Sequence, residues 1–521
     1  MRRLRVCIVD LMTAGTNDGL WSRLMHPNFA SIMPQVIGVW CEEAGHQVRL
    51  VCYTGAEDLA REVPADTDVL FVAAYSQAAQ LSYALSNLYR RRGVITVVGG
   101  PHARCYPDDA ATYFDYVLGF TDKPTVLEVL RDCSPHPEVG VRLAAKRQPT
   151  CLPGVRERWK FIEPTVAKTP VIKLIPMIAS LGCPYTCSFC IDATVEYQPL
   201  ETAQIQEDLR FLLGKLERPR VAWHDPNFGV RFDAIMSAIE EAVPPGRIDF
   251  AAESSLSLLS EPHLRRLRAN GFQAILPGIE SWYSLGGKSR TGCRTGLEKV
   301  GLVSDHVNMI LRYIPYVQAN FVLGLDDDEG EEPFELTKRF VDLTPGVFPA
   351  YSLLSAFGQA APLNLELQRT GRVLPTPFHF LDNNRATNVR PKNYTWASLY
   401  DNVIGLRKHS FSWRAMGRRF DANQGAIASG LNVVRALSSE GAGRIQHDSN
   451  IRRLLDSDAS LRSFFEGDST ALPRFYTDQV RKDLGPFWSA LPKGALSHDP
   501  NAYLRAHQAL DPRRPPSSPA P

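Results

Sequence analysis

Long hydrophobic runs and an excess of one charge are both missing from this 521-residue sequence. No stretch of about 18 consecutive apolar residues occurs, which excludes a spanning helix. The 58 basic and 56 acidic residues give a formal net charge of +2, so nothing supports wholesale binding to nucleic-acid phosphates. The opening segment MRRLRVCIVD lacks a small-residue cleavage site, and Asp10 interrupts its apolar run. We therefore expect a first strand there instead of a signal peptide, and a cytoplasmic protein without a membrane span.

Hydrophobic side chains are plentiful, and cysteines are unevenly placed. The 44% hydrophobic and 22% charged residues suit a globular protein with two or three cores. Seven of the ten cysteines are scattered, whereas three lie within eight residues, at 183–190. In a reducing compartment, this crowding indicates a metal site and not a disulfide.

Residues 1–132 alternate short β-branched runs with stretches of helical period, which predicts a parallel sheet with crossover helices. A helix is expected over residues 35–44, between Pro34 and Gly45. The pattern predicts an open Rossmann-like or flavodoxin-like domain, whose ligands lie beyond the carboxyl ends of the strands. The expected strands are residues 5–10, 48–53, 69–73, 94–98 and 116–118.

The rest of the chain divides into four segments. Residues 133–168 carry five prolines and no sustained period, which favours a linker or an irregular bridging segment. Residues 169–392 show a second β/α series, which predicts a barrel or partial barrel. A mainly helical region over 393–510 and a disordered tail over 511–521 follow. The strands expected in the second series are residues 171–179, 221–223, 249–252, 274–276, 317–323 and 351–354.

The strongest chemical signal is the cysteine triplet Cys183, Cys187 and Cys190, spaced CxxxCxxC directly after a predicted strand. Three thiolates on one tight loop can bind three corners of an iron–sulfur cube. The fourth iron then has no nearby cysteine, and an open coordination site is what binds and activates a small molecule. The alternatives are chance clustering or a zinc loop completed by a distant residue, although zinc sites usually come as paired CxxC units and none follows here.

This segment resembles the cluster loop of the radical S-adenosylmethionine (SAM) superfamily. In that family, SAM chelates the unique iron through its amino and carboxylate groups and is cleaved reductively to a 5′-deoxyadenosyl radical. The resemblance implies that Cys183, Cys187 and Cys190 are the catalytic and metal-binding ligands of a [4Fe–4S] cluster. Phe189 matches the family's aromatic residue, whose backbone commonly contacts adenine; simple packing is the alternative.

Three later segments, 224–229, 252–254 and 278–281, resemble those after the second, third and fourth barrel strands of cobalamin-type members. The resemblance implies that Asp225, Glu253, Glu280 and Ser281 hold the amino acid and ribose of SAM. Hydroxyls and an ammonium group need such fixed acceptors in a sheltered site. As alternatives, Asp225 starts a turn and Glu253 is a solvated strand end. Glu280 carries the most weight.

The amino-terminal domain resembles the cobalamin-binding domain that precedes the barrel in class B radical SAM enzymes, through segments 43–48 and 97–102. Gly99, Gly100 and His102 are the implied cofactor residues, because glycines let the backbone approach a bulky ligand. Domains that supply a lower cobalt ligand carry DxHxxG, but methionine at position 12 replaces that histidine here. A five-coordinate or water-ligated cobalt is therefore implied. The alternative is a Rossmann-like domain that no longer binds cobalamin.

Two weaker sequence patterns do not predict a binding site. The sequence Gly287-Lys288-Ser289 is similar to the end of a P-loop, but Trp282 stands where the loop needs glycine, so no phosphate cradle is expected. The basic stretch over 407–419 favours a solvated helix face. Only Cys293 follows the cluster loop, which excludes auxiliary multi-cysteine clusters.

Together these features predict an α/β protein with a flavodoxin-like cobalamin domain, a partial (β/α)6 TIM-like barrel and a helical carboxy-terminal region. The resemblance implies an enzyme that methylates an unactivated carbon of a small molecule through the 5′-deoxyadenosyl radical and methylcobalamin. An external electron donor such as flavodoxin or ferredoxin is implied too. The carboxyl ends of both sheets should face each other across a closed cavity. The alternatives are cyclisation, oxidation or rearrangement, 3-amino-3-carboxypropyl transfer, and a non-catalytic iron–sulfur sensor.

Overall fold

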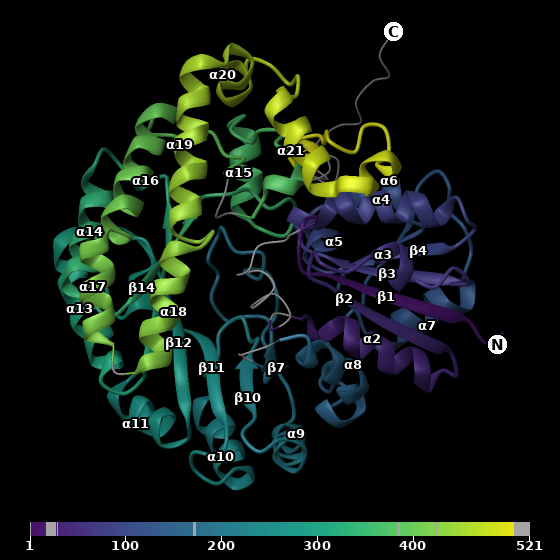
Figure 1. The fold of residues 1–521 in the computed structure, drawn as a ribbon, viewed down its shortest axis with the longest axis horizontal. Helices are drawn as coiled ribbons and strands as arrows, with labels where there is room; N and C mark the ends of the chain where they lie inside the picture. The colour runs from purple at the N-terminus through teal and green to yellow at the C-terminus, as the bar shows by residue number, and fades with distance from the viewer. Residues whose placement is uncertain are drawn as a thin grey trace, which may run out of the picture.

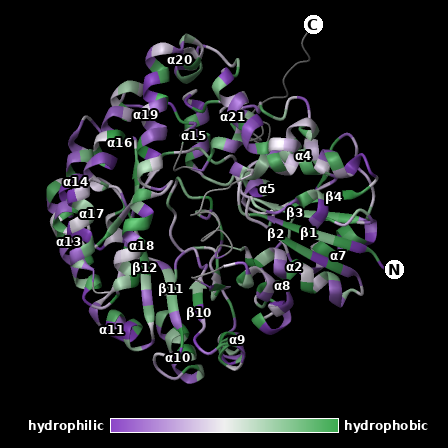
Figure 2. Cartoon of the chain, in the orientation of Figure 1, coloured by the Kyte–Doolittle hydropathy of each residue, from purple (hydrophilic) through white to green (hydrophobic). Residues whose placement is uncertain are grey.

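Two parallel six-stranded sheets form the framework of the protein in a computed structural model (Figure 1). The structure describes residues 2–16, 28, 30–169, 173–382, 386–423 and 425–504. The first sheet and its helices lie on the right of Figure 1, and the second sheet lies on the left. The strands of both sheets are strongly hydrophobic (Figure 2), as expected for parallel sheets with both faces covered.

The first sheet has the strand order β2-β1-β3-β4-β5-β6 and is parallel throughout. This order is flavodoxin-like, and its switch point lies between β1 and β3. The expected open sheet is therefore confirmed, with strand bounds within one residue of the prediction for the first five strands. The strands are β1 (Arg5–Leu11), β2 (Gln47–Tyr53), β3 (Val69–Ala74), β4 (Ile95–Gly99), β5 (Tyr116–Leu118) and β6 (Val141–Leu143).

Helices cover both faces of this sheet because the side chains of each strand alternate between two cores. In β1, Val6 and Ile8 pack into the core with α2, while Cys7 and Val9 pack into the core with α4. The expected helix over 35–44 is confirmed as α2, which begins three residues earlier. The helices of this part are α2 (Ile32–Glu43), α3 (Leu59–Glu62), α4 (Ala79–Arg90), α5 (Pro101–Cys105), α6 (Pro107–Tyr113) and α7 (Lys123–Asp132).

The proline-rich segment 133–168 is more regular than a linker. It supplies the edge strand β6 and the helix α8 (Val155–Ala167), which continues through Pro164. Helix α8 packs against α2 of the first part and against α9 of the second. The expectation of a linker fails here because a three-residue strand and a proline-containing helix both lack a clear sequence period.

The second sheet has the order β14-β13-β12-β11-β10-β7 and is also parallel. Within the described residues β7 and β14 are its outer strands, so the predicted partial barrel of six β/α units is confirmed. The expected strand over 171–179 lies partly outside the described residues. The strands are β7 (Leu174–Met177), β10 (Arg220–Trp223), β11 (Asp249–Ser255), β12 (Phe272–Glu280), β13 (Tyr316–Leu323) and β14 (Phe348–Leu353).

Helices of the barrel alternate with these strands in sequence. A short antiparallel pair, β8 (Ser180–Leu181) and β9 (Gln198–Pro199), interrupts the series after β7. The helices are α9 (Thr202–Lys215), α10 (Phe232–Ala242), α11 (Glu261–Ala269), α12 (Gly286–Ser289), α13 (Gly296–Leu311), α14 (Glu332–Leu343) and α15 (Leu363–Arg369).

The carboxy-terminal region is helical, as predicted, and connects the barrel to the first sheet (Figure 1). Its last part packs on α4, where Asn87 Nδ2 donates to the carbonyl oxygen of Ala490 at 2.7 Å. None of the helices in the described ranges has the length and apolarity to cross a bilayer. The expected tail over 511–521 lies outside the described residues. The helices are α16 (Trp396–Ser410), α17 (Trp413–Ala422), α18 (Ala426–Leu437), α19 (Ala442–Ser457), α20 (Ala459–Glu466) and α21 (Arg474–Leu484).

Candidate functional site

The cysteine loop extends from β8 to β9, and the pairing of these two strands closes its base. Gly182 has φ +70°, and a Cβ atom there would lie 2.4 Å from the carbonyl oxygen of Glu196. Only glycine therefore fits the entry to the loop. Cys187 is buried, Cys183 and Cys190 are half-buried, and all three thiols are free. The loop thus presents three unpaired sulfur ligands.

The donor set fits an iron–sulfur cluster. Burial raises the pKa of Cys190 to about 11, and the backbone N–H of Asp192 opposes this shift by donating to Cys190 Sγ at 3.4 Å. Hydrogen bonds to ligand sulfurs are one of the means by which a protein tunes such a cluster. In the described parts of the chain, no three His, Cys, Asp or Glu side chains converge on one metal-ion position. The absence of such a single-ion position does not bear on an iron–sulfur cube, because in a cube each cysteine binds a different iron.

Asp225 supports the loop from the end of β10. Its carboxylate accepts a hydrogen bond from Ser180 Oγ at 2.6 Å and from the backbone N–H of Ala179 at 3.1 Å. Burial raises the pKa of Asp225 to about 6, against these hydrogen bonds. The carboxylate expected to contact SAM is thus engaged with the segment that leads into the cysteine loop.

Glu280 and Lys288 form a largely buried ion pair close to the cysteine loop. Lys288 Nζ lies 2.8 Å from Glu280 Oε1, and the two side chains are 19% and 12% exposed. Burial alone would lower the pKa of Lys288, but the charges of Glu280, Cys187 and Cys183 outweigh it and raise this pKa. Lys288 therefore lies within electrostatic reach of the predicted cluster ligands. The comparison of residues 287–289 with a P-loop did not identify the ion pair that Lys288 forms. The available sequence signal was a positive charge eight residues after the negative charge of Glu280.

The backbone around Glu280 is unusual. Glu280 itself has φ +67°, and a Cβ atom at Gly278 would lie 2.1 Å from Glu280 Oε1. Gly278 therefore makes room for the carboxylate to fold back over β12. Ser281, the other predicted contact in this segment, is 3% exposed, and its Oγ accepts the backbone N–H groups of Tyr283 and Ser284. Its hydroxyl holds a turn.

Glu253 and Phe189 occupy different surroundings. The Glu253 side chain is exposed, yet burial by the surrounding protein and the charge of Glu280 raise its pKa, while Lys288 lowers it. Phe189 packs against a small apolar cluster that contains Leu354, Ala356, Leu367 and Val389. Its side chain thus packs, while the expected contact between its backbone and adenine stays a prediction.

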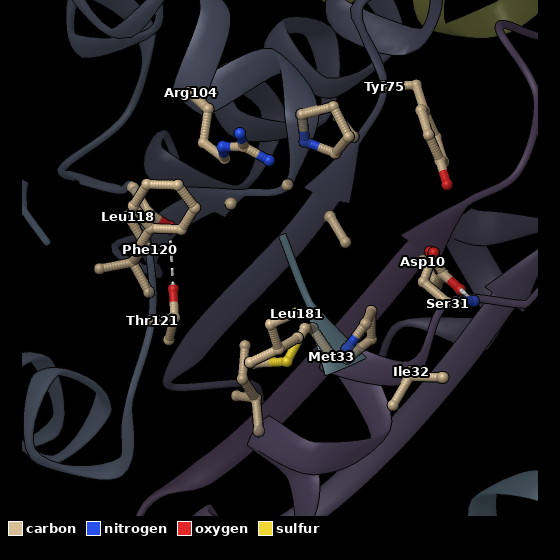
Figure 3. Close-up of a pocket in the computed structure, with 18 of the residues that line it drawn as sticks. Asp10, Ser31, Ile32, Met33, Tyr75, Arg104, Leu118, Phe120, Thr121 and Leu181 are labelled. Carbon is tan, nitrogen blue, oxygen red and sulfur yellow. Dashed lines mark hydrogen bonds between the residues drawn. The ribbon is translucent and has the colours of Figure 1, made fainter. Parts of the chain in front are cut away.

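A cavity lies where the carboxyl ends of the two sheets meet (Figure 3). Its empty volume is about 1390 Å³, which includes space that is open to solvent. The first sheet contributes residues that end or follow β1, β3, β4 and β5, and the second contributes residues that follow β7 and β10. The predicted opposition of the two carboxyl edges is therefore present. Lining residues from the two sides include Asp10, Tyr75, Gly99, Gly100 and Phe120, and Leu181, Gly182, Asp192 and His224.

Gly99 and Gly100 form a bare stretch of this wall. Gly100 has φ +91° and ψ −171°, a conformation that is essentially restricted to glycine. A Cβ atom there would lie 3.0 Å from the carbonyl oxygen of Ala74. Next to it, a Cβ atom at Gly99 would meet nothing closer than Leu118 at 3.9 Å. The pair thus leaves a flat backbone surface in a largely apolar cavity, which fits a large macrocycle such as cobalamin.

His102 does not join this wall. It is fully buried, and its Nε2 lies 2.5 Å from the hydroxyl of Tyr83, which also donates to Asp109 Oδ2 at 2.5 Å. Burial lowers the pKa of His102 to about 3, so the ring is neutral. His102 therefore does not line the cavity with Gly99 and Gly100, and its ring points from α5 into the core beside Tyr83.

Several polar side chains of the cavity were not singled out from the sequence, among them Tyr75, Arg104 and His224. An N–H of Arg104 donates to Asp192 Oδ1 at 3.0 Å, which ties α5 to the residues after the cysteine triplet. Burial lowers the pKa of His224 to about 4, so this ring is uncharged at neutral pH. Their positions directly after β3, in α5 and after β10 were the available signal, because ligands of parallel sheets lie at the carboxyl ends.

This arrangement, a flavodoxin-like sheet that faces a three-cysteine loop on a partial barrel, is similar to solved structures of cobalamin-dependent radical SAM enzymes. The resemblance found in the sequence is therefore confirmed for the fold. No family model matches the sequence. The structure of TsrM, a radical SAM methyltransferase from Kitasatospora setae, with tryptophan and a SAM analogue bound, is similar at TM-score 0.55 and 13% identity, over 87% of this chain and all of that one. OxsB, a cobalamin-dependent radical SAM enzyme with aqua-cobalamin bound, is similar at TM-score 0.52 and 12% identity, over 94% of this chain and 84% of that one.

Two curated relatives from Chlorobaculum tepidum are similar in sequence. Bacteriochlorophyllide d C-12(1)-methyltransferase is 23% identical over 364 residues, which cover 68% of this chain and 76% of the relative. Bacteriochlorophyllide d C-8(2)-methyltransferase is 25% identical over 230 residues, which cover 42% of this chain and 50% of the relative.

Proposed function

We propose that this chain is a cobalamin-dependent radical SAM enzyme that methylates a carbon atom of a small molecule. The observation that carries the proposal is the shared cavity, because Gly182 and Asp192, which flank the cysteine triplet, line it together with the strand ends of the flavodoxin-like sheet. Radical chemistry needs such an enclosed site, since a primary radical in bulk solvent is quenched. The two curated relatives support methyl transfer, because both are methyltransferases.

Different residues would bind the two cofactors. Cys183, Cys187 and Cys190 would hold the [4Fe–4S] cluster, and Gly99 and Gly100 would lie against cobalamin. When bound, the cluster supplies an electron for SAM cleavage and cobalamin supplies the transferable methyl group. An external donor such as flavodoxin or ferredoxin would supply the electrons.

Glu280 and Lys288 suit the amino-acid end of SAM. A carboxylate accepts hydrogen bonds from an ammonium group, and the Lys288 ammonium can pair with a carboxylate. The two side chains already lie 2.8 Å apart. An amino acid that carries both groups can therefore bind across the pair without leaving either charge unpartnered.

For the methyl acceptor, we propose a largely apolar aromatic small molecule. The relatives act on bacteriochlorophyllide d, and the TsrM structure contains tryptophan as substrate. Apolar side chains such as Ile32, Leu118 and Phe120 line much of the cavity. Chlorin pigments and indoles are therefore the first acceptors to test.

The test uses the anaerobically reconstituted full chain with cluster, cobalamin, reductant and SAM that carries a trideuteromethyl group. Mass spectrometry should find the acceptor heavier by that group, together with 5′-deoxyadenosine and S-adenosylhomocysteine. Cys187→Ala should abolish 5′-deoxyadenosine and the labelled acceptor, because both depend on SAM cleavage at the cluster. Cys293→Ala, at an exposed cysteine outside the loop, is the matched control and should keep them.

Three results would contradict the proposal. SAM that stays uncleaved by the fully loaded protein would leave only a sensor role. Formation of 5′-deoxyadenosine without methyl transfer to any acceptor would favour cyclisation, oxidation or rearrangement. A chain that retains no corrinoid would exclude the methyl donor.

A further inference from the structure

Helices α17 and α18 carry an apolar face that no other part of the described chain covers. Three residues separate the two helices, which pack against each other as a hairpin. They lie on the left of Figure 1, remote from the first sheet, and none of their described residues lines the cavity. We call the exposed large side chains of this region the hairpin face. They are between 47% and 78% exposed, and they are Trp413, Phe420, Ile427, Val434 and Leu437.

The spacing of these residues is that of a seam between packed helices. Trp413 and Phe420 are seven residues apart in α17. In α18, Ile427, Val434 and Leu437 follow one another at intervals of seven and three residues. Apolar residues at such intervals lie on one side of a helix and mark the seam of a coiled coil. The opposite sides of both helices are already buried against the rest of the chain, so the hairpin face is the side left for another helix.

Two glycines inside these helices point to the same kind of contact. Gly417 lies within α17 and Gly430 within α18. A glycine in a helix interior costs stability relative to alanine. A Cβ atom at either position would meet no atom within 4 Å. No contact within the described chain therefore requires glycine there, whereas the close approach of a second helix would.

The charges beside the hairpin face are balanced. Arg414 and Asp421 are both exposed and lie seven residues apart, so they follow one edge of α17. Among the side chains that the structure describes, neither has an ionic or hydrogen-bonding partner. Arg418, the half-buried cation between them, pairs with Asp342. An anionic lipid surface requires an excess of Lys and Arg, so the balanced pair favours a protein partner over a membrane.

We propose that the hairpin face joins two copies of this chain around a two-fold axis that passes near Gly417. Such an axis places α17 of the two copies antiparallel, and it brings each residue i of one copy to residue j of the other and the reverse. Arg414 of each copy then meets Asp421 of the other copy, and Trp413 packs near Phe420. The sequence of α17 is self-complementary in both respects.

The area of the hairpin face agrees with a dimer. Its five side chains offer on the order of 600 Å² of apolar surface, at the upper end of what a monomer leaves exposed. A stable interface takes about 800 Å² from each partner, so the flanking polar side chains have only the remainder to supply. The inference is independent of the proposed cofactors and of methyl transfer.

The test follows the oligomeric state of the full-length protein by sedimentation velocity from nanomolar to micromolar concentration. Wild type should dimerise. Arg414→Glu places two carboxylates opposite each other at both symmetric contacts, and Asp421→Lys does the same with two cations. Each should raise the dissociation constant of the dimer about 10- to 100-fold. Leu297→Ser, at a 55% exposed leucine of α13, is the matched control and should dimerise like wild type.

A mixture of the two single variants separates a direct contact from misfolding. In a heterodimer of Arg414→Glu with Asp421→Lys, both contacts again join opposite charges. The equimolar mixture should therefore regain dimers with nearly the wild-type dissociation constant, although each variant alone stays largely monomeric. A misfolded variant could not be restored by mixing.

Each remaining outcome overturns the inference. Wild type may be tested over the whole concentration range, and a monomer throughout would exclude the dimer. Single variants that dimerise like wild type, or a mixture that stays monomeric, would show that Arg414 and Asp421 do not meet across a two-fold axis. Co-sedimentation of monomeric wild type with vesicles of phosphatidylglycerol and phosphatidylcholine would assign the hairpin face to a membrane surface.

Discussion

The ion pair between Glu280 and Lys288 should be among the most strongly coupled pairs in the barrel. At 2.8 Å and an effective dielectric constant of about 20, Coulomb attraction amounts to about 6 kcal/mol, and desolvation of the two charges offsets part of it. Both side chains are less than one-fifth exposed. We therefore expect a coupling free energy of about 2–4 kcal/mol, and a loss of about 3–5 kcal/mol when either partner is removed alone.

A double-mutant cycle measures this coupling. The variants are Glu280→Gln, Lys288→Met and the double substitution, each followed by urea unfolding at matched protein concentration. The double variant should lose less stability than the sum of the single ones, because no charge is left buried without a partner. Equal denaturant slopes are required for the comparison.

The chain offers a matched control pair. Arg294 and Glu298 also lie 2.8 Å apart, but their side chains are 56% and 65% exposed. Their coupling should stay below about 1 kcal/mol and fall further in high salt. If the two cycles give equal couplings, or if the Glu280 and Lys288 substitutions add within about 0.5 kcal/mol, the assignment of a buried, mutually dependent pair is refuted.

Three further predictions concern the walls of the site. Gly100→Ala should destabilise the chain by about 2–3 kcal/mol in urea titrations and reduce corrinoid retention, because its φ of +91° excludes a Cβ atom. Burial raises the pKa of Asp225 from 3.8 to about 6, so the folded chain keeps a proton that the unfolded chain releases. Asp225 by itself should thus lower the unfolding free energy by up to about 3 kcal/mol between about pH 4 and 6, and Asp225→Asn should remove this share of the pH dependence. Tyr83→Phe should lower the melting temperature, because Asp109 loses its hydrogen bond at 2.5 Å; an unchanged melting temperature would contradict this.

The strands of the two six-stranded sheets were predictable because these sheets are parallel and covered on both faces, which forces runs of apolar β-branched residues. Among them the exception is β6, a three-residue edge strand whose burial is only partial. The short antiparallel strand β9 also escaped prediction. Helix α8 escaped prediction for another reason. Pro164 lies within it, and the packing of α8 on α2 and α9 outweighs the local preference to end the helix.

The site was predictable to the extent that its chemistry is local in sequence. The spacing of the cysteine triplet specifies one loop. Asp225 and Ser281 were predicted from the sequence to contact SAM, and the structure adds that their oxygens accept backbone hydrogen bonds from Ala179 and Tyr283. No sequence pattern could distinguish these roles, because the partners of Asp225 lie more than 40 residues away. Lys288 escaped because its pairing with Glu280 depends on the positive φ of Glu280.

Asp10 and Asp225 have equivalent places in the two sheets, and this equivalence explains why the cavity is shaped before any cofactor binds. Each carboxylate lies at the carboxyl end of a strand, is 2% exposed, and accepts a backbone N–H from a segment that forms the cavity wall. Burial raises the pKa of both to about 6, so each carboxylate is ionised at neutral pH only because its hydrogen bonds offset much of the desolvation. A wall held by charged hydrogen bonds on both sides resists collapse when empty. The binding energy of the cofactors is then available for their orientation, not for ordering the loops that receive them.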